Sequence, residues 1–190
     1  VIYRKPLDRN LFTQGLEINV GALYLSSGLY RQSRLQRYDW PDMILRDDIP
    51  LAGRIFAEGL TVFGERVHQL TWRSRIALVY ERNNLARQQW FRLPGQGWGL
   101  THNDRELIYS DGSHRLHFVA PQTWEHLRTL EVHEDGEPLR ELNELEWIEG
   151  RVWANVWRTD RVVIINPDTG EVEQGIDFSG LLPLPERQPG

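Results

Sequence analysis

Short runs of apolar residues alternate with polar ones along the chain, and turn residues separate the runs. Residues 145–148, 152–157 and 162–165 are rich in β-branched and aromatic side chains, with turn-forming residues at 149–150 and 167–170 between and after them. A period of two bounded by such turns is typical of antiparallel strands. The pattern therefore predicts an all-β protein.

The predicted strands recur as a fourfold repeat. The middle residues of four aligned triplets, the repeat marks, lie 44, 40 and 45 residues apart, which is the period of four-stranded propeller blades. The triplets are Gln14-Gly15-Leu16, Glu58-Gly59-Leu60, Trp98-Gly99-Leu100 and Asn143-Glu144-Leu145. Thirteen residues after the marks, glycine alternates with tryptophan: Gly28, Trp72, Gly112 and Trp157.

Residues 1–7 resemble the segment before the second mark and are predicted to form the outer strand of a further blade. In closed propellers such a strand pairs with inner strands from the other end of the chain, which removes an exposed sheet edge. Those inner strands are expected from about residue 189 onward. We therefore expect one propeller domain over 1–190, a five-bladed ring with four blades and one outer strand in this sequence. Residues 182–190 are expected to be a loop leading to an incomplete last blade.

The residues just before the marks should converge, because inner strands surround the propeller axis. These are Gln14, Glu58, Trp98 and Asn143. Two amides, a carboxylate and an indole at one repeat position favour a binding site, although drift among polar residues at the blade edges would give the same pattern. Trp72 and Trp157 are candidates for pocket walls, with core packing as the alternative.

Glu58 is the strongest candidate for an acid or base. A carboxyl group surrounded by indoles is desolvated, which raises its pKa toward the range useful for proton transfer. Glu144 and Glu146 are weaker candidates, because the side chain of a strand residue can equally point away from the axis.

Composition and missing motifs exclude several functions. A net charge of −5 argues against nucleic-acid binding, and no apolar run approaches the ~18 residues of a membrane helix. The absence of cysteine removes thiol nucleophiles and cysteine-bound zinc. The six histidines lack the zincin spacing, and no phosphate loop or nucleophile elbow occurs. No metal or other cofactor is expected for catalysis. Whether a structural cation occupies the channel is left open by the sequence.

Several motifs in order along the chain resemble the plant and bacterial glutaminyl cyclases, or glutaminyl-peptide cyclotransferases. They are Phe12-Thr13-Gln14-Gly15-Leu16, Glu58-Gly59-Leu60-Thr61, Gly97-Trp98-Gly99-Leu100-Thr101, Ser110-Asp111-Gly112, Asn143-Glu144-Leu145-Glu146-Trp147 and Ala154-Asn155-Val156-Trp157. The resemblance implies a five-bladed propeller that converts the N-terminal glutamine of a peptide to pyroglutamate and releases ammonia without a catalytic metal. The family continues with an Asn-Gly-Ile-Ala strand and a Thr-Gly-Lys segment, which do not follow Gly190 in this sequence.

The resemblance also implies the roles of the candidate residues. The family's active-site glutamate corresponds to Glu58, and we expect substrate binding by Gln14, Trp72, Trp98, Asn143, Trp157 and Glu144. Expected partners are peptides or proteins with N-terminal glutamine. We expect a monomer that binds neither nucleic acid nor membrane and is periplasmic or secreted, with no signal peptide in this sequence.

Two other functions stay open from the residues alone. A non-catalytic propeller that binds a peptide or glycan at the channel mouth would use the same aromatic side chains but would not need Glu58. A metal-dependent propeller hydrolase or lactonase would need several converging carboxylates or histidines, and Glu58 and Glu144 are the candidates that the repeat offers.

Overall fold

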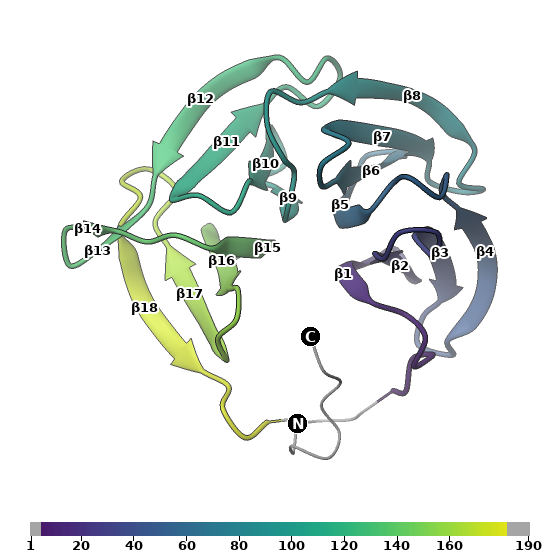
Figure 1. The fold of residues 1–190 in the computed structure, drawn as a ribbon, viewed down its shortest axis with the longest axis horizontal. Helices are drawn as coiled ribbons and strands as arrows, with labels where there is room; N and C mark the ends of the chain where they lie inside the picture. The colour runs from purple at the N-terminus through teal and green to yellow at the C-terminus, as the bar shows by residue number, and fades with distance from the viewer. Residues whose placement is uncertain (1–4, 182–190) are drawn as a thin grey trace.

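The computed structural model describes residues 5–181, which form strands and no helix. Four antiparallel sheets of four strands stand around a common axis as propeller blades (Figure 1). This arrangement confirms the predicted all-β propeller with four blades. Residues 5–7 lie in no strand, and the rest of the predicted outer strand, like the predicted loop at 182–190, lies outside the described residues.

Each blade runs from an inner strand at the axis to an outer strand at the rim. Blade 1 contains β1 (Thr13–Asn19), β2 (Ala22–Ser27), β3 (Arg34–Asp39) and β4 (Ile44–Pro50), and blade 2 contains β5 (Ala57–Phe63), β6 (Arg66–Thr71), β7 (Ile76–Glu81) and β8 (Arg87–Arg92). Blade 3 contains β9 (Leu100–His102), β10 (Leu107–Ser110), β11 (Arg115–Val119) and β12 (His126–Glu131). A short hairpin, β13 (His133–Glu134) and β14 (Glu137–Pro138), leads to blade 4 with β15 (Leu142–Ile148), β16 (Arg151–Val156), β17 (Arg161–Ile165) and β18 (Val172–Asp177).

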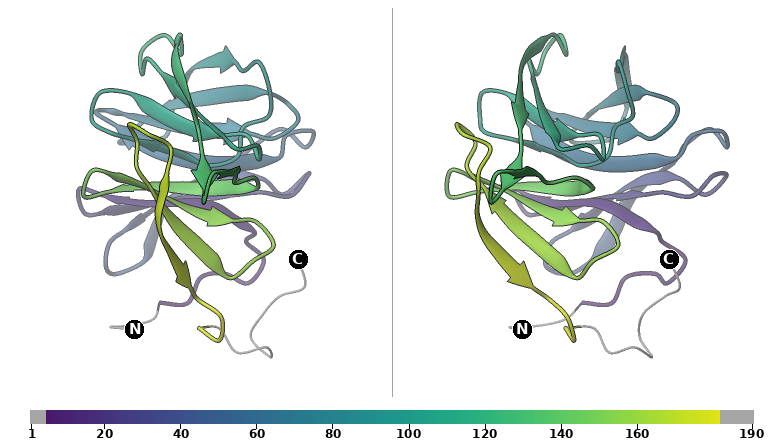
Figure 2. Two further views of the ribbon diagram at one scale, coloured as in Figure 1. Left: turned by 90° about the vertical axis from the view of Figure 1, so that its left-hand side faces the viewer. Right: turned by 60° about the vertical axis from the view of Figure 1, so that its left-hand side comes forward.

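Burial follows the position of a strand within its blade. Strand β2 is buried along its whole length, because both of its faces are covered, whereas the outer strands β4 and β8 alternate between exposed and partly buried residues. Strand β18, yellow in the ribbon views, lies along the outer margin of blade 4 in Figure 1 and passes in front of the other strands of that blade when this side is turned to the viewer (Figure 2). The core therefore lies between blades, and it includes Leu35, Val67 and Leu78 between blades 1 and 2.

Close backbone contacts at three repeat marks bring the inner strands together. A Cβ atom on Gly15 would lie 2.6 Å from the Leu60 nitrogen, one on Gly59 2.6 Å from the Trp98 oxygen, and one on Gly99 2.0 Å from the Asn143 oxygen. Each mark therefore meets the backbone of the next blade, and only glycine leaves room for this approach. We call these three residues the axial glycines.

Neither a helical membrane span nor a metal cluster occurs in the part of the chain that the structure describes. No helix there is long and apolar enough to cross a membrane. Within residues 5–181, no group of three or more histidine, cysteine, aspartate or glutamate residues is arranged to hold a metal ion. The expectation that no cofactor is needed stays a prediction.

Candidate active site

Six of the seven candidate residues line one cavity of about 220 Å³ near the axis. They are Gln14, Glu58, Trp72, Trp98, Asn143 and Trp157, and the cavity is completed by Phe12, Leu29 and Phe56. Residues from all four blades therefore meet at one place, as the repeat marks predict. Their roles in binding and catalysis stay predictions.

Serine hydroxyl groups fix two of the converging residues from the neighbouring blade. Ser26, at the end of β2, donates a hydrogen bond to the backbone oxygen of Glu58. Ser110, at the end of β10, donates to the backbone oxygen of Asn143 over 2.8 Å. Both serines are buried and stand eleven residues after a repeat mark, so the repeat itself positions these two pocket residues.

Aromatic rings in edge-to-face pairs form the walls of the cavity. The ring centroids of Phe56 and Trp72 are 5.6 Å apart with an interplanar angle of 66°, and those of Trp98 and Trp157 are 5.4 Å apart at 78°. This geometry is favourable for aromatic pairs because the positive ring edge meets the negative face. The walls therefore stabilise one another without a bound ligand.

Gln96 joins the two walls and was not among the candidate residues. Its side-chain oxygen accepts hydrogen bonds from the indole nitrogens of Trp72, at 2.6 Å, and Trp98, at 3.1 Å. A carbonyl oxygen has two lone pairs, so one amide satisfies both donors. Gln96 thus sets the separation of two indoles that come from blade 2 and from the loop before blade 3.

The alternating glycines make room for the rings. A Cβ atom on Gly28 would lie 2.5 Å from a ring carbon of Phe56, and one on Gly112 would lie 2.5 Å from a ring carbon of Trp98. Gly112 also has a φ of +81°, which is strained for residues with a side chain. The position thirteen residues after the mark thus has two uses. In blades 2 and 4 it holds a tryptophan of the cavity wall, and in blades 1 and 3 it holds a glycine that leaves room for the ring of Phe56 or Trp98.

Glu58 lies in this apolar setting with its side chain almost withdrawn from water. The residue is 5% exposed, and no described residue makes an ion pair or hydrogen bond with its carboxyl group. Burial raises the pKa of Glu58 to about 9, because the charged form loses its hydration. At neutral pH the carboxyl group therefore carries a proton and can donate it.

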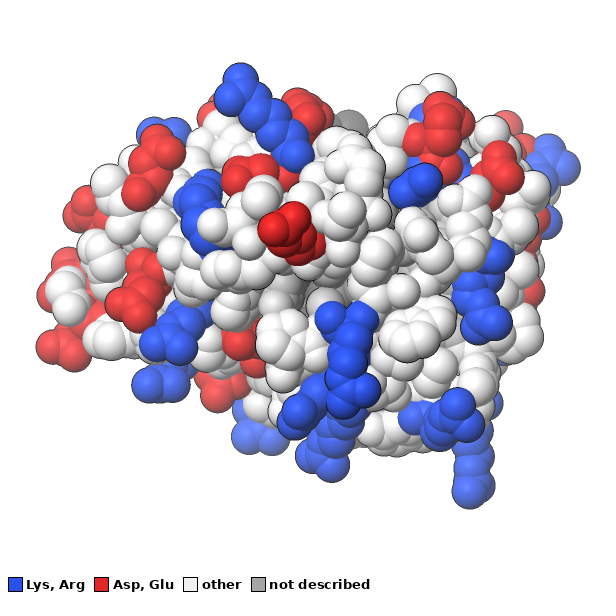
Figure 3. All heavy atoms as spheres, turned by 90° about the horizontal axis from the view of Figure 1, so that it is seen from above, with Lys and Arg blue, Asp and Glu red and all other residues white. Residues whose placement is uncertain are grey.

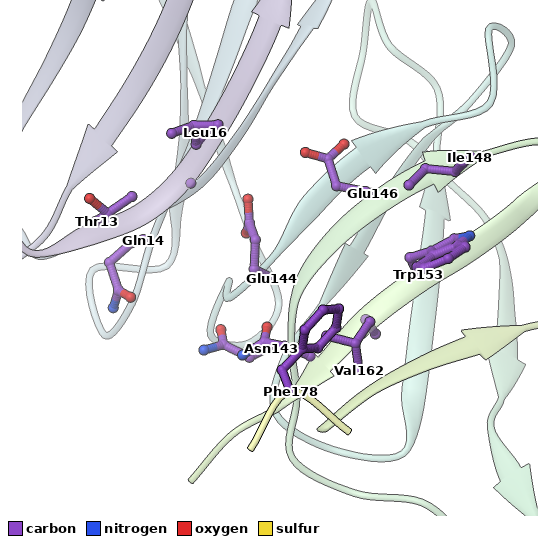
Figure 4. Close-up of a pocket in the computed structure, with 13 residues that line it drawn as sticks. Thr13, Gln14, Leu16, Asn143, Glu144, Glu146, Ile148, Trp153, Val162 and Phe178 are labelled. Atoms are coloured by element: carbon purple, nitrogen blue, oxygen red, sulfur yellow. The ribbon is translucent and has the colours of Figure 1, made fainter. Parts of the chain in front are cut away.

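Glu144 differs from the other candidates because it does not line the 220 Å³ cavity. It lines a neighbouring cavity of about 550 Å³ between β1 and β15, together with Glu146 (Figure 4). Gln14 and Asn143 line both cavities. Glu144 does not line the first cavity, so its direct contact with substrate stays a prediction.

The two glutamates of the second cavity are also strongly perturbed. The residue Glu144 is partly exposed, but its two carboxyl oxygens are buried, and neither has a hydrogen-bond partner among the described groups. Burial, followed by repulsion from Glu146 and Glu58, raises the pKa of Glu144 well above its usual range. Burial and repulsion from Glu17 raise the pKa of Glu146 to about 7. Both groups thus hold a proton more readily than an exposed glutamate does.

Comparison with known proteins agrees with this geometry. The sequence model of the family described as glutamine cyclotransferase matches residues 1–189. A glutaminyl-peptide cyclotransferase from Arabidopsis thaliana is 35% identical over 175 residues, which cover 90% of this chain and 54% of the relative. The chain thus spans about half the length of that curated relative.

Solved structures give the same result. The crystal structure of glutaminyl cyclase from Myxococcus xanthus matches with a TM-score of 0.83 and 35% identity, covering 90% of this chain and 73% of the other. Virginiamycin B lyase from Staphylococcus aureus, at a TM-score of 0.60 and 10% identity, covers 94% of this chain and 58% of the other, and shares the fold alone. On the family match and the identity to these relatives, the chain belongs to the glutamine cyclotransferase family.

Proposed function

We propose that this protein cyclises the N-terminal glutamine of peptides to pyroglutamate and releases ammonia. The observation that carries the proposal is a buried carboxyl group, Glu58, in a small aromatic cavity that also contains the amides of Gln14 and Asn143; burial raises the pKa of this group to about 9. Family membership supports the same activity. The proposed partners are peptides or proteins with an N-terminal glutamine.

The walls of the cavity would first hold the substrate in a folded conformation. The α-amine is the nucleophile and the γ-carboxamide carbon is the electrophile, so both reacting groups belong to one flexible residue. Confining that residue between the indoles of Trp72, Trp98 and Trp157 converts lost conformational freedom into proximity of the reacting atoms. Gln14 and Asn143 are placed to hydrogen bond to the carboxamide or the peptide backbone.

Glu58 would then move the proton that the reaction requires. The neutral amine forms a bond to the carboxamide carbon, and the bond from that carbon to the amide nitrogen breaks. Glu58 donates its proton to the departing nitrogen, which leaves as ammonia, and takes the proton that the attacking nitrogen loses. The carboxyl group ends in its starting state, and general acid–base catalysis of this kind contributes typically about 10²–10⁴-fold.

The test is ammonia release from a short peptide with N-terminal glutamine, compared with the same peptide carrying N-terminal asparagine, in excess chelator. We expect release from the glutamine peptide alone, and Glu58→Gln should lower turnover by about 10²–10⁴-fold with the fold intact. Glu149→Gln, a change in the exposed turn before β16, is the matched control and should leave turnover unchanged. Binding of the peptide without ammonia release would instead identify a binding propeller.

We also propose that the complete ring has five blades. Strands of blades 4 and 1 are not paired with each other in the described chain, and the 550 Å³ cavity separates their inner strands β15 and β1 (Figure 1). A further four-stranded sheet at this position would cover both strands. An experimental structure of the protein as isolated from its source, with no sheet between β18 and β1, would refute this proposal.

A further inference from the structure

Three loops at the pocket carry arginines and no acidic residue. The loops over residues 28–33, 51–56 and 72–75 belong to blades 1 and 2, and each contributes at least one residue to the cavity wall. They contain Arg31, Arg54, Arg73 and Arg75, and neither aspartate nor glutamate. We call these four residues the arginine rim.

Backbone hydrogen bonds hold the three loops side by side. The amide of Arg31 donates to the oxygen of Gly53 over 3.0 Å, and the amide of Trp72 donates to the oxygen of Phe56 over 3.1 Å. The arginines therefore share one part of the pocket mouth although they come from separate segments of the chain.

An aromatic path leads from the cavity onto this rim. The rings of Phe56 and Trp72 line the cavity, and the ring of Tyr30 lies 5.5 Å from that of Phe56 in an edge-to-face contact. Tyr30 is 44% exposed and does not line the cavity. It offers a surface for the residues that follow a glutamine bound inside.

The rim arginines are exposed and make no ion pair with any residue between 5 and 181. Four other arginines of these two blades, Arg34, Arg37, Arg46 and Arg82, pair with Asp48, Asp47, Asp39 and Glu65, whereas Arg66, Arg87 and Arg92 make no ion pair within residues 5–181. The guanidinium carbon of Arg73 lies 4.1 Å above the ring of Trp72, so one of the charges is held against a pocket wall. Unpaired guanidinium groups are suited to bind carboxylates through two parallel hydrogen bonds.

The opposite half of the mouth has another charge pattern. The loops 111–114 and 157–160, together with Glu141, whose backbone hydrogen bonds to both loops, carry three acidic residues, at 111, 141 and 160, and one arginine, at 158. Figure 3 shows one side of the molecule, seen from above the view of Figure 1, with Lys and Arg side chains along its lower edge. An acidic peptide would thus be attracted more strongly toward blades 1 and 2 than toward blades 3 and 4.

We propose that the arginine rim binds acidic residues that follow the N-terminal glutamine of the substrate. The inference rests on the proposed function and adds to it a substrate class, namely glutaminyl peptides with aspartate or glutamate near their N-terminus. The glutamine occupies the cavity, the next residue crosses Tyr30, and the following carboxylates pair with the rim.

The experiment compares two peptides, Gln-Ala-Asp-Glu-Ala and its neutral counterpart Gln-Ala-Asn-Gln-Ala, by calorimetric binding and by ammonia release. The acidic peptide should bind about three- to tenfold more tightly at low ionic strength, as expected for two exposed ion pairs. The preference should disappear in about 0.5 M salt, where the screening length falls to a few ångströms.

The triple variant Arg31→Gln, Arg54→Gln, Arg75→Gln should bind both peptides equally and retain wild-type affinity for the neutral one. Arg105→Gln, an exposed arginine in the loop between β9 and β10, is the control and should retain the preference. Equal binding of both peptides by the wild-type protein, or an unchanged preference in the triple variant, would overturn the proposal. If the triple variant fails to fold, the salt dependence of the wild-type preference decides. Ammonia release is scored separately, so its absence with a retained binding preference would refute the proposed reaction and leave the rim supported.

Discussion

Replacing Gly112 with alanine should damage the pocket through a single methyl group. The new Cβ atom would lie 2.5–2.7 Å from three ring carbons of Trp98. Favourable carbon contacts are at about 3.5–4.0 Å, so the indole must move by roughly 1 Å or the glycine loop must yield. The Trp98 indole is hydrogen bonded to Gln96 on one side and packs against Trp157 on the other. Because both sides are occupied, we expect the displaced indole to move into the cavity.

The expected loss of stability has two components that a matched variant separates. A left-handed backbone costs a residue with a side chain about 1–2 kcal/mol, and overpacking a filled site costs typically about 1–3 kcal/mol. Gly136 has a φ of +84° and no atom within 4 Å of an added Cβ. Gly136→Ala should therefore lose about 1–2 kcal/mol and Gly112→Ala about 2–5 kcal/mol in the free energy of unfolding.

Urea unfolding followed by far-ultraviolet circular dichroism measures both losses, and ammonia release gives kcat/KM for a glutaminyl peptide. We expect Gly136→Ala to keep wild-type kcat/KM, whereas Gly112→Ala should lose up to about 10²-fold, the cost of a misplacement near 1 Å. If both variants lose the same free energy of unfolding and keep wild-type kcat/KM, Gly112 is not required to leave room for the Trp98 indole.

Three further outcomes are expected. The pH profile of kcat/KM should rise with deprotonation of the substrate amine, near pH 7.7–8.0, and fall above about pH 9 as Glu58 loses its proton; a profile still rising at pH 10 would contradict the acid role. Gln96→Ala should raise KM for a glutaminyl peptide by about threefold to tenfold, because two indoles lose a hydrogen bond worth about 0.5–1.5 kcal/mol, whereas the exposed Gln88→Ala should not. Because the pKa of Glu144 is raised, this group stays protonated to higher pH in the folded state than in the unfolded state. The free energy of unfolding therefore falls as pH rises above about 4.3, the pKa of a glutamate in the unfolded chain, by up to about 1.4 kcal/mol per pH unit. Urea unfolding at pH 5 and pH 8 should show a smaller difference for Glu144→Gln than for the wild type, and an equal difference would contradict the assignment.

The repeat explains why so much of the site could be predicted from the sequence. Equivalent positions in successive blades stand at equivalent places around the axis, so fixed offsets in sequence become neighbours in space. Gln14, Glu58, Trp98 and Asn143 are such neighbours, and the structure places all four at one cavity.

Three pocket residues outside the predicted set follow the same rule. Phe12, Phe56 and Gln96 each stand three residues before a repeat mark, and the first two line the cavity while the third holds its walls. The backbone oxygens of Phe12 and Phe56 accept hydrogen bonds from Gly28 and Trp72, which stand at the glycine–tryptophan position. The signal was therefore present at a fixed offset, but two phenylalanines and a glutamine do not suggest one common role.

The location of Glu144 could not be predicted in the same way. It stands at a repeat mark where the other blades have glycine, so the repeat offers no equivalent side chain to follow. The direction of the Glu144 side chain depends on the space between blades 4 and 1. That space is set by the assembled ring and not by any single strand. The sequence pattern also gives no sign that the two carboxyl oxygens of Glu144 are buried without a hydrogen-bond partner among residues 5–181.

The axial glycines have a consequence for how this site can change. At each axial glycine, the inner strand contacts the main chain of the next blade. The position of the backbone there does not depend on the side chain of the preceding residue. Gln14, Glu58 and Trp98, which directly precede the axial glycines, can thus change while the backbone contact beneath them stays the same. New specificities can therefore arise by changes at these positions, provided that each new side chain fits the aromatic cavity.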